Sequence, residues 1–133
     1  MAVVTKKINI NTKGDTDIVD ITPQVATSVS NAGVDKGVVS IFVSGSTGGI
    51  TTVEYEPGLI QDLKKFFEKI APKSGIYQHN LRWHDGNGYS HVRASFLGPG
   101  MTVPFIDRRL QLGTWQQIIF IDFDNRPRTR EIL

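Results

Sequence analysis

The chain has 133 residues, of which 39% are hydrophobic and 21% are charged, and its formal net charge is +2 at pH 7. This composition predicts a single globular domain over residues 1–133, and so small a charge does not favour nucleic-acid binding. The absence of cysteine excludes disulfides, thiolate metal sites and cysteine nucleophiles. Because no long apolar run or apolar leader is present, we expect a cytoplasmic protein without a membrane partner.

Hydrophobic periodicity predicts most of the elements. In the first half of the chain we expect strands over residues 3–10, 17–21, 38–43 and 51–55. The apolar run 38–43 is typical of an interior strand. Thr22–Pro23 predicts the start of a helix, because a hydroxyl suits the N-cap and proline suits the first turn.

A second helix is predicted over residues 57–70, where apolar side chains recur on one face and lysines lie opposite. The remaining expected strands cover residues 92–97, 101–105, 115–123 and 128–133. Two helices among so many strands predict an α+β fold: a two-layer sandwich of a mixed or antiparallel β-sheet with helices packed on one face.

All three histidines lie within 13 residues, at His79, His84 and His91. Histidine is the side chain best suited to moving protons or holding a metal near neutral pH. Spacings of five and seven residues cannot place all three on one helix face. Gly86 and Gly88 suit a turn, so we expect two short extended pieces with a site built across them. Metal ligation, with zinc as the metal, and general acid–base catalysis both stay open.

Groups that bind oxyanions are found in two places. All seven arginines follow residue 81, whereas all eight lysines precede residue 74, so the arginines share a half with the histidines. The segment from Ser44 to Gly49 leaves N–H groups free to approach a phosphate, and Ser46 and Thr47 add hydroxyls. Taken alone, this segment is more typical of a plain strand connection.

Glu54 and Glu56 would share one face of the strand predicted around them. If that face belongs to the site, Glu54 can act as a base or a metal ligand; otherwise both are surface charges.

Several elements, in this order and spacing, resemble the YjbQ-like family (UPF0047, also called secondary thiamine-phosphate synthase). They are Ser46-Thr47, Thr-Val-Glu54, Tyr77-Gln-His79-Asn80, Ser90-His91-Val-Arg-Ala-Ser-Phe-Leu-Gly98-Pro99, Thr102-Val103-Pro104, Leu110-Gln-Leu-Gly113-Thr114-Trp115-Gln116 and Asp124-Asn-Arg126-Pro-Arg128. The resemblance implies an α+β fold and a compact homotrimer with sites near subunit interfaces. The matching functional positions are His79, His91, Glu54, Thr47, Thr114, Gln116 and Arg126.

The resemblance also implies a reaction, in which hydroxymethylpyrimidine diphosphate is joined to a thiazole phosphate and pyrophosphate is released. For that reaction we expect Arg93, Arg126 and the Ser46–Gly49 backbone to bind phosphate groups, and His79 or His91 to assist proton transfer. A magnesium ion would bridge the diphosphate and Glu54. Magnesium prefers oxygen ligands, whereas a three-histidine site suits zinc, so the sequence does not decide between these two metals. No organic cofactor is expected.

One position departs from the family pattern. Many members carry His-Thr-Thr where this chain has Gly45-Ser46-Thr47, and glycine can neither ligate a metal nor transfer a proton. We favour replacement of the missing group by His84, in which case His84→Ala would cost as much activity or metal affinity as His79→Ala. The alternative function is a non-catalytic trimeric module that binds a metal or a phosphorylated metabolite. A weaker alternative is a structural trimer whose histidines pair across an interface.

Overall fold

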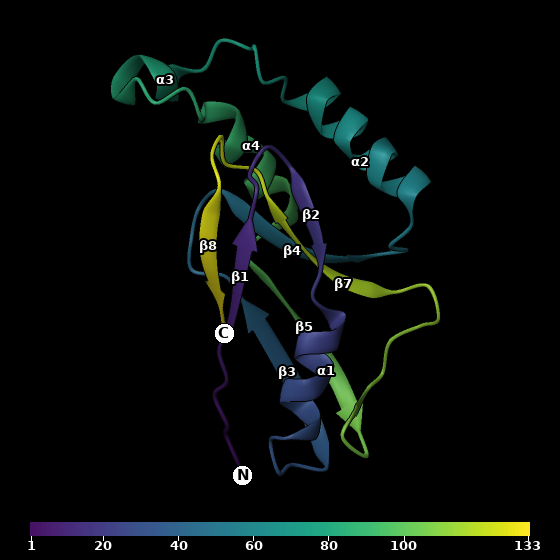
Figure 1. Cartoon of the computed structure of the whole chain (residues 1–133). Helices are drawn as coiled ribbons and strands as arrows, with labels where there is room; N and C mark the ends of the chain where they lie inside the picture. The colour runs from purple at the N-terminus through teal and green to yellow at the C-terminus, as the bar shows by residue number, and fades with distance from the viewer.

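The computed structural model describes residues 1–133 and contains eight strands and four helices (Figure 1). In chain order the elements are β1 (Ile8–Thr12), β2 (Asp17–Asp20), α1 (Thr22–Ser30), β3 (Lys36–Phe42), β4 (Gly48–Val53), α2 (Pro57–Ile70), α3 (Gln78–Trp83), α4 (Gly88–Leu97), β5 (Gly100–Ile106), β6 (Arg109–Leu110), β7 (Gln117–Asp122) and β8 (Arg128–Ile132). The expected α+β class is confirmed. None of the helices has the length and apolar character needed to cross a membrane.

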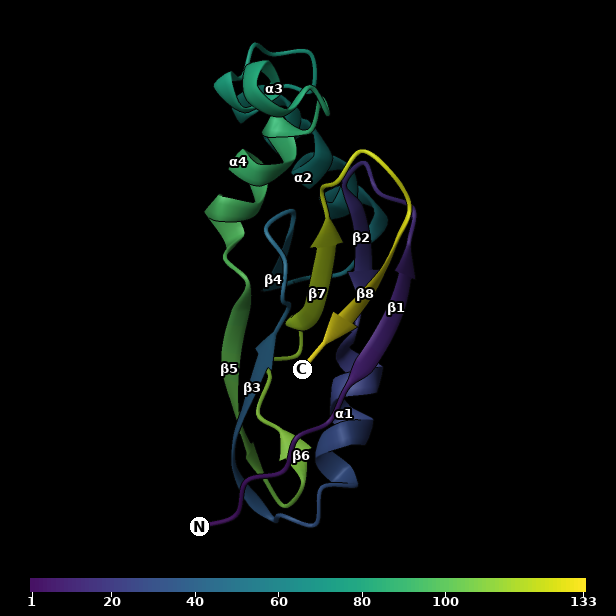
Figure 2. The same ribbon diagram turned by 90° about the vertical axis from the view of Figure 1, so that its left-hand side faces the viewer.

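The strands form three antiparallel ladders with the orders β1-β8, β2-β7-β4 and β3-β5-β6. β3 continues into the first ladder at its end, because Phe42 and Leu133 exchange two backbone hydrogen bonds. Seen edge-on, β3 and β5 form one layer, β7 lies in the middle, and β1 and β8 lie on the far side (Figure 2).

β7 is the central strand and is covered on both faces. Ile118 and Phe120 belong to one hydrophobic cluster, whereas Ile119 and Ile121 belong to another, and all four are fully buried. Alternation of side chains along a strand explains this division. A continuous apolar run is typical of a strand buried on both sides. The strand expected over residues 115–123 is confirmed as β7, within two residues at its start and one at its end.

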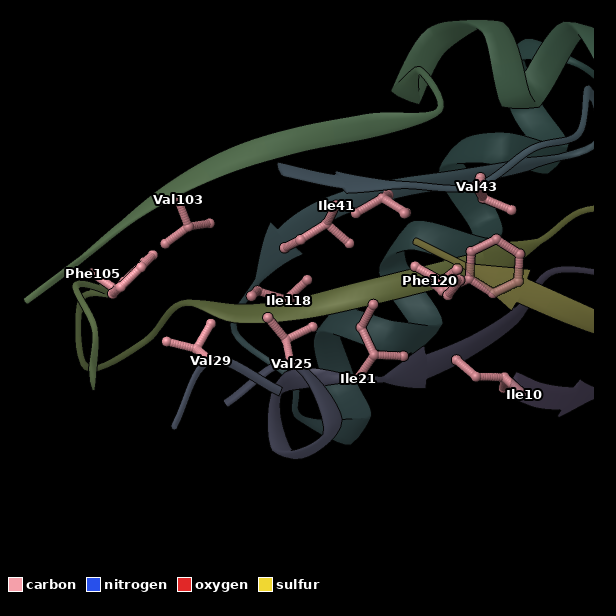
Figure 3. Packing of buried hydrophobic residues seen from close by; sticks show 12 residues of the cluster. Ile10, Ile21, Val25, Val29, Ile41, Val43, Val103, Phe105, Ile118 and Phe120 are labelled. Carbon is pink, nitrogen blue, oxygen red and sulfur yellow. The ribbon is translucent and has the colours of Figure 1, made fainter. Parts of the chain in front are cut away.

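The larger cluster lies between β7 and the β3–β5 layer (Figure 3). Val25 and Val29 of α1 pack there against Ile118, together with Ile41 of β3 and Val103 of β5. α1 therefore covers the same face of β7 as the second sheet layer does.

The smaller cluster lies on the opposite face of β7, under two other helices. Phe67 of α2 and Ala94 of α4 pack there against Ile119 and Ile121. α4 packs closely on β4: a Cβ atom at Gly49 of β4 would lie only 2.6 Å from Cβ of Leu97 in α4. This packing fixes the position of α4, which carries one of the histidines.

Several predictions from the sequence were wrong about local structure. The strand expected over residues 3–10 begins only at Ile8, as β1. The segment 92–97 is part of α4 rather than a strand, and the histidine window forms α3, a loop and α4 rather than extended pieces. Buried positions in α4 recur at helical spacing, but Ser90 and Arg93 are polar, so the apolar pattern hides the helix.

β3 was predicted to be an interior strand and is instead an edge of its three-stranded sheet. Its outer face stays open to solvent, with the Val38 side chain 67% exposed.

Candidate functional site

His79 and His91 lie against each other at the junction of α3 and α4. Their ring centroids are 4.4 Å apart and the ring planes are inclined by 38°. Each histidine occupies the first turn of its helix. The loop between the helices returns the chain so that residues 12 apart in sequence become neighbours. Figure 1 shows this junction at the end of the molecule where β7 also runs into β8.

Close contact between the two helices holds the histidines together. The backbone N–H of Gly88 donates to Oδ1 of Asn80 at 2.9 Å. A Cβ atom at Gly88 would lie 2.6 Å from Cβ of Tyr77, a separation that real side chains do not tolerate. Glycine is therefore needed where α4 begins, and it sets the distance between the two rings.

The electrostatic surroundings make the two histidines unequal. Burial lowers the pKa of His91 below its ordinary value, and the neighbouring His79 lowers that pKa further, although Asp85 and Asp124 oppose both effects. The His91 imidazole is therefore neutral near pH 7 and can accept a proton. Nδ1 of His79 lies 3.4 Å from Oδ1 of Asp85 but is buried without a hydrogen-bond partner. A buried polar atom without a partner is uncommon, and such atoms are found at functional sites.

A buried ionic network lies at the carboxyl end of β7. Both oxygens of Asp122 accept hydrogen bonds from Arg130, through Nε and Nη2 at 2.8 Å each. Oδ2 of Asp124 accepts bonds from Nε and Nη2 of Arg128 at 3.0 and 2.6 Å. Asp122 and Asp124 are fully buried, so each carboxylate depends on its arginine for compensation.

Asp124 joins this network to the histidines. Burial alone would raise the pKa of Asp124, but the Asn125 N–H, Arg128 and Asn87 donate hydrogen bonds that hold it below its usual value. Nδ2 of Asn87 donates to Oδ1 of Asp124 at 3.3 Å, and the N–H of His91 donates to the carbonyl of Asn87 at 3.4 Å. Oδ1 of Asn87 is buried and has no partner.

The Ser44–Gly49 segment contributes to the same region. The Thr47 hydroxyl donates to Oδ2 of Asp124 at 3.3 Å and accepts from Nη2 of Arg130 at 2.7 Å. Thr47 is buried, whereas Ser46 beside it is exposed. The structure thus places Thr47, one of the expected positions, close to the network that contacts His91.

Arg93, which was expected to bind a phosphate, has its guanidinium engaged inside the protein. Its Nε, Nη1 and Nη2 donate to the Ala71 carbonyl, to Thr16 and to Glu68 at 2.9, 2.9 and 2.7 Å. The side chain is buried and ties α4 to α2 and to the β1–β2 turn. Because each nitrogen already donates within the protein, we no longer expect Arg93 to bind a phosphate.

Glu54, Thr114 and Gln116 are exposed and lie at the opposite end of β4 and β7. The register pairs Gly48 with Asp122 but Val53 with Gln117, and six residues of strand span about 20 Å. One chain therefore does not bring these three residues to the histidine pair.

Glu54 and Glu56 do not lie on a strand, which corrects the sequence prediction. β4 ends at Val53, and Glu56 caps α2 by accepting hydrogen bonds from the N–H groups of Gly58 and Leu59. Arg126 lies in the exposed β7–β8 connection, where its side chain makes no ion pair.

His84 stands apart from the stacked pair. It is exposed and caps the end of α3 in the left-handed conformation, with φ of 56°. Within the chain, no three histidine, aspartate or glutamate side chains are grouped so that they could hold a metal ion. Metal binding by His79, His84 and His91 stays a prediction, as does the replacement of the missing histidine by His84.

Sequence reasoning missed Asp122, Asp124, Arg130 and Asn87. A signal was present, because Asp122 ends the most apolar strand and Asp124 follows it two residues later, and buried carboxylates require partners. A surface hollow of about 440 Å³ lies elsewhere, between α1 and β6, and is lined by none of the histidines.

Comparison with known proteins gives one consistent result. The family model described as "UPF0047 protein YjbQ-like" matches residues 6–133. A UPF0047 protein of Methanothermobacter thermautotrophicus is 36% identical over 132 residues, which cover 99% of this chain and 90% of that protein.

Two solved structures agree with the fold. A YbjQ-like protein of unknown function from Sulfolobus solfataricus has a TM-score of 0.90 at 34% identity, covering 96% of this chain and 91% of that one. An uncharacterized conserved protein of the YjbQ/UPF0047 family from Clostridium acetobutylicum has a TM-score of 0.88 at 32% identity, covering 97% of each chain.

Proposed function

This chain belongs to the YjbQ-like (UPF0047) family, and we propose that it is an enzyme acting on a phosphorylated small metabolite, with His79 and His91 as proton-transfer groups. The observation that supports this most is the stacked pair itself, half-buried at one end of the molecule, with one imidazole held neutral and the other presenting an unpartnered Nδ1. A neutral imidazole in contact with a second imidazole can serve in proton transfer.

The specific reaction that we propose is the formation of thiamine phosphate. The thiazole nitrogen attacks the methylene carbon of hydroxymethylpyrimidine diphosphate, the carbon–oxygen bond breaks, and pyrophosphate leaves with the electron pair. Negative charge develops on the leaving group, so N–H donors must stabilise it. In this proposal Arg126 and the Ser46–Gly49 segment supply such donors. His91 accepts a proton from the substrate as the carbon–oxygen bond breaks and returns it once the carbon–nitrogen bond has formed.

A bound metal would change this chemistry, and the donor set within one chain does not fit one. A catalytic zinc ion uses three protein ligands, whereas the structure brings only His79 and His91 together. A magnesium ion requires oxygen ligands, and Glu54 lies at the far end of β4. The proposed reaction therefore depends on protein donors alone.

We further propose that the protein assembles as a homotrimer, as the family resemblance implies. Val38 and Phe42 of β3 and Ile106 of β5 are exposed and lie on one outer sheet face, which another copy of the chain would cover. In such an assembly a neighbouring copy would supply Glu54, Thr114 and Gln116 to the histidine pair.

The test is a synthase assay with hydroxymethylpyrimidine diphosphate and thiazole phosphate, in which thiamine phosphate and pyrophosphate are both measured. We expect His79→Gln and His91→Gln each to lower the rate by about 10²- to 10⁴-fold. Wild-type activity in both variants, with their folds intact, would overturn the assignment. His84→Gln in the same assay tests whether His84 replaces the missing family histidine.

The second candidate is a binding module without turnover. It is favoured by Gly45, which leaves the site one side-chain donor short of the family pattern, and by the unpartnered Nδ1 of His79 and Oδ1 of Asn87. A rise in melting temperature with the diphosphate, without product, would support the module over the enzyme.

A further inference from the structure

The short loop Ser44–Thr47 has backbone donors that the fold does not use. None of its four N–H groups donates a hydrogen bond to another group of the chain. Ser44, Gly45 and Ser46 are exposed residues. The loop lies between β3 and β4 and is anchored at Thr47, whose carbonyl accepts from Phe123 at 2.9 Å.

Arg130 presents a further unused donor beside this loop. Its Nε and Nη2 are occupied by Asp122 and Thr47, whereas Nη1 makes no hydrogen bond. The side chain is only 10% exposed, so its position is fixed by packing. A Cβ atom at Gly45 would lie 3.2 Å from Nη1. The free end of a nearly buried guanidinium therefore points at the one position in the loop that has no side chain.

We propose that Nη1 of Arg130 and the N–H groups of Ser44–Thr47 form a binding niche for a phosphate group. Backbone N–H groups and an arginine are the donors that phosphate oxygens take most readily. This proposal deepens the proposed function and rests on it for the identity of the substrate, because the phosphate bound here would belong to the metabolite acted on by the histidine pair.

The local charge is compatible with an anion. Asp122 is compensated by Arg130, and Asp124 by Arg128, so the buried network has no net charge. Hydrogen bonding to Asp122 raises the pKa of Arg130, which therefore stays charged across the whole working range of pH. Thr47 and Asp124 connect the niche to Asn87 and so to the first turn of α4, where His91 lies.

Gly45 is the residue that determines access to the niche. Its φ is not in the left-handed region, so a larger residue fits the backbone there. Any side chain at this position would lie against Nη1 of Arg130 and occupy the space of an oxyanion. The glycine that removes a proton-transfer group from the family pattern thereby opens a phosphate site.

Calorimetric titration with inorganic phosphate tests this directly. We expect the wild type to bind phosphate. The affinity of Gly45→Val should be about 10-fold or more below that of the wild type, because a charge-assisted hydrogen bond is lost. Gly45→Ala should bind phosphate with an intermediate affinity. The melting temperature of Gly45→Val should match that of the wild type, since the substitution leaves the Arg130–Asp122 pair intact. Arg109→Gln, at an exposed arginine without an ionic partner, is the matched control and should bind phosphate normally.

Two results would overturn the proposal: no phosphate binding by the folded wild type, or equal binding by the wild type and Gly45→Val. Amide chemical shifts locate the phosphate, and changes confined to Ser44–Thr47 are expected. His79→Gln and His91→Gln should still bind phosphate. If the protein binds phosphate in the niche but forms no thiamine phosphate, the proposed reaction is contradicted and the niche is not.

Discussion

At the scale of single residues, the burial of His91 determines what the histidine pair can do. A half-buried imidazole next to a second imidazole resists protonation, so the His91 pKa lies below its ordinary 6.5. His79 is the only histidine that it contacts. Asp85 and Asp124 face the pair and limit the shift without reversing it.

The lowered pKa predicts how stability depends on pH. Between the folded pKa of His91 and 6.5, the unfolded chain binds more protons than the folded one, so stability falls as the pH falls through this window. Above pH 6.5 the neutral His91 no longer lowers the free energy of unfolding as the pH changes. The free energy of unfolding, measured with urea at about pH 7 and about pH 5, should decrease less between the two pH values for His91→Gln than for the wild type. The exposed His84→Gln variant should behave as the wild type does; identical acid losses in all three proteins would contradict the predicted shift.

The Asp122–Arg130 pair predicts a large effect on stability. Asp122→Asn leaves the nearly buried guanidinium without its charge partner, and breaking a buried pair costs about 3–5 kcal/mol. The exposed pair of Asp35 with Arg108 provides a matched control, because Asp35→Asn should change stability by about 1 kcal/mol or less. Denaturant titrations of both variants check this, and equal small losses would show that the buried network does not support the fold.

At the scale of elements, the sequence predicts those whose polar and apolar residues separate cleanly. The helix expected over residues 57–70 matches α2, because its apolar positions keep one face. β7 and β8 are likewise recovered within two residues or so. α3 and α4 are missed because α4 buries Ser90 and Arg93, whose polar groups are satisfied by Phe123 and by α2. Such burial cannot be read from a hydrophobic pattern.

The junction of α3 and α4 depends on glycine. Gly88→Ala would place a methyl group 2.6 Å from Cβ of Tyr77 and 2.9 Å from Oδ1 of Asn80. The helices must then separate, so we expect a loss of about 1–3 kcal/mol together with weaker coupling between the His79 and His91 rings. Thermal melting and histidine ring chemical shifts measure the two effects. Ser95→Ala, on the exposed side of α4, is the control; unchanged ring shifts in Gly88→Ala would contradict this account of the junction.

At the scale of the whole molecule, the site is assembled from segments that are distant in sequence. Thr47, Asp124 and Arg130 meet because β4 pairs with β7 and β8 follows β7 back along the molecule. Asn87 joins them because α4, which it precedes, packs on β4. The sequence reveals His79 and His91 as a cluster, but it contains no sign that Arg130, rather than Arg93, has a free nitrogen. That distinction depends on which arginine the tertiary fold leaves unpaired.

Assembly is the second property of the whole molecule that can be tested. If the outer face of β3 and β5 is covered by other copies, Val38→Lys and Ile106→Lys should lower the molar mass in solution from three chains toward one. Light scattering after size exclusion measures this. Ile76→Lys alters a residue that is 92% exposed in the α2–α3 connection and should leave the mass unchanged. If the wild type has the molar mass of a single chain in solution, the proposed trimer is contradicted.

The most direct test of the proposed site uses the three histidines themselves, since each gives one pair of ring nitrogen signals. Titration with hydroxymethylpyrimidine diphosphate should shift the signals of His79 and His91 and leave those of His84 in place. A response of all three would support the role that the sequence suggested for His84. If calorimetry shows that the diphosphate binds while the His79 and His91 signals do not move, the stacked pair is not the functional site.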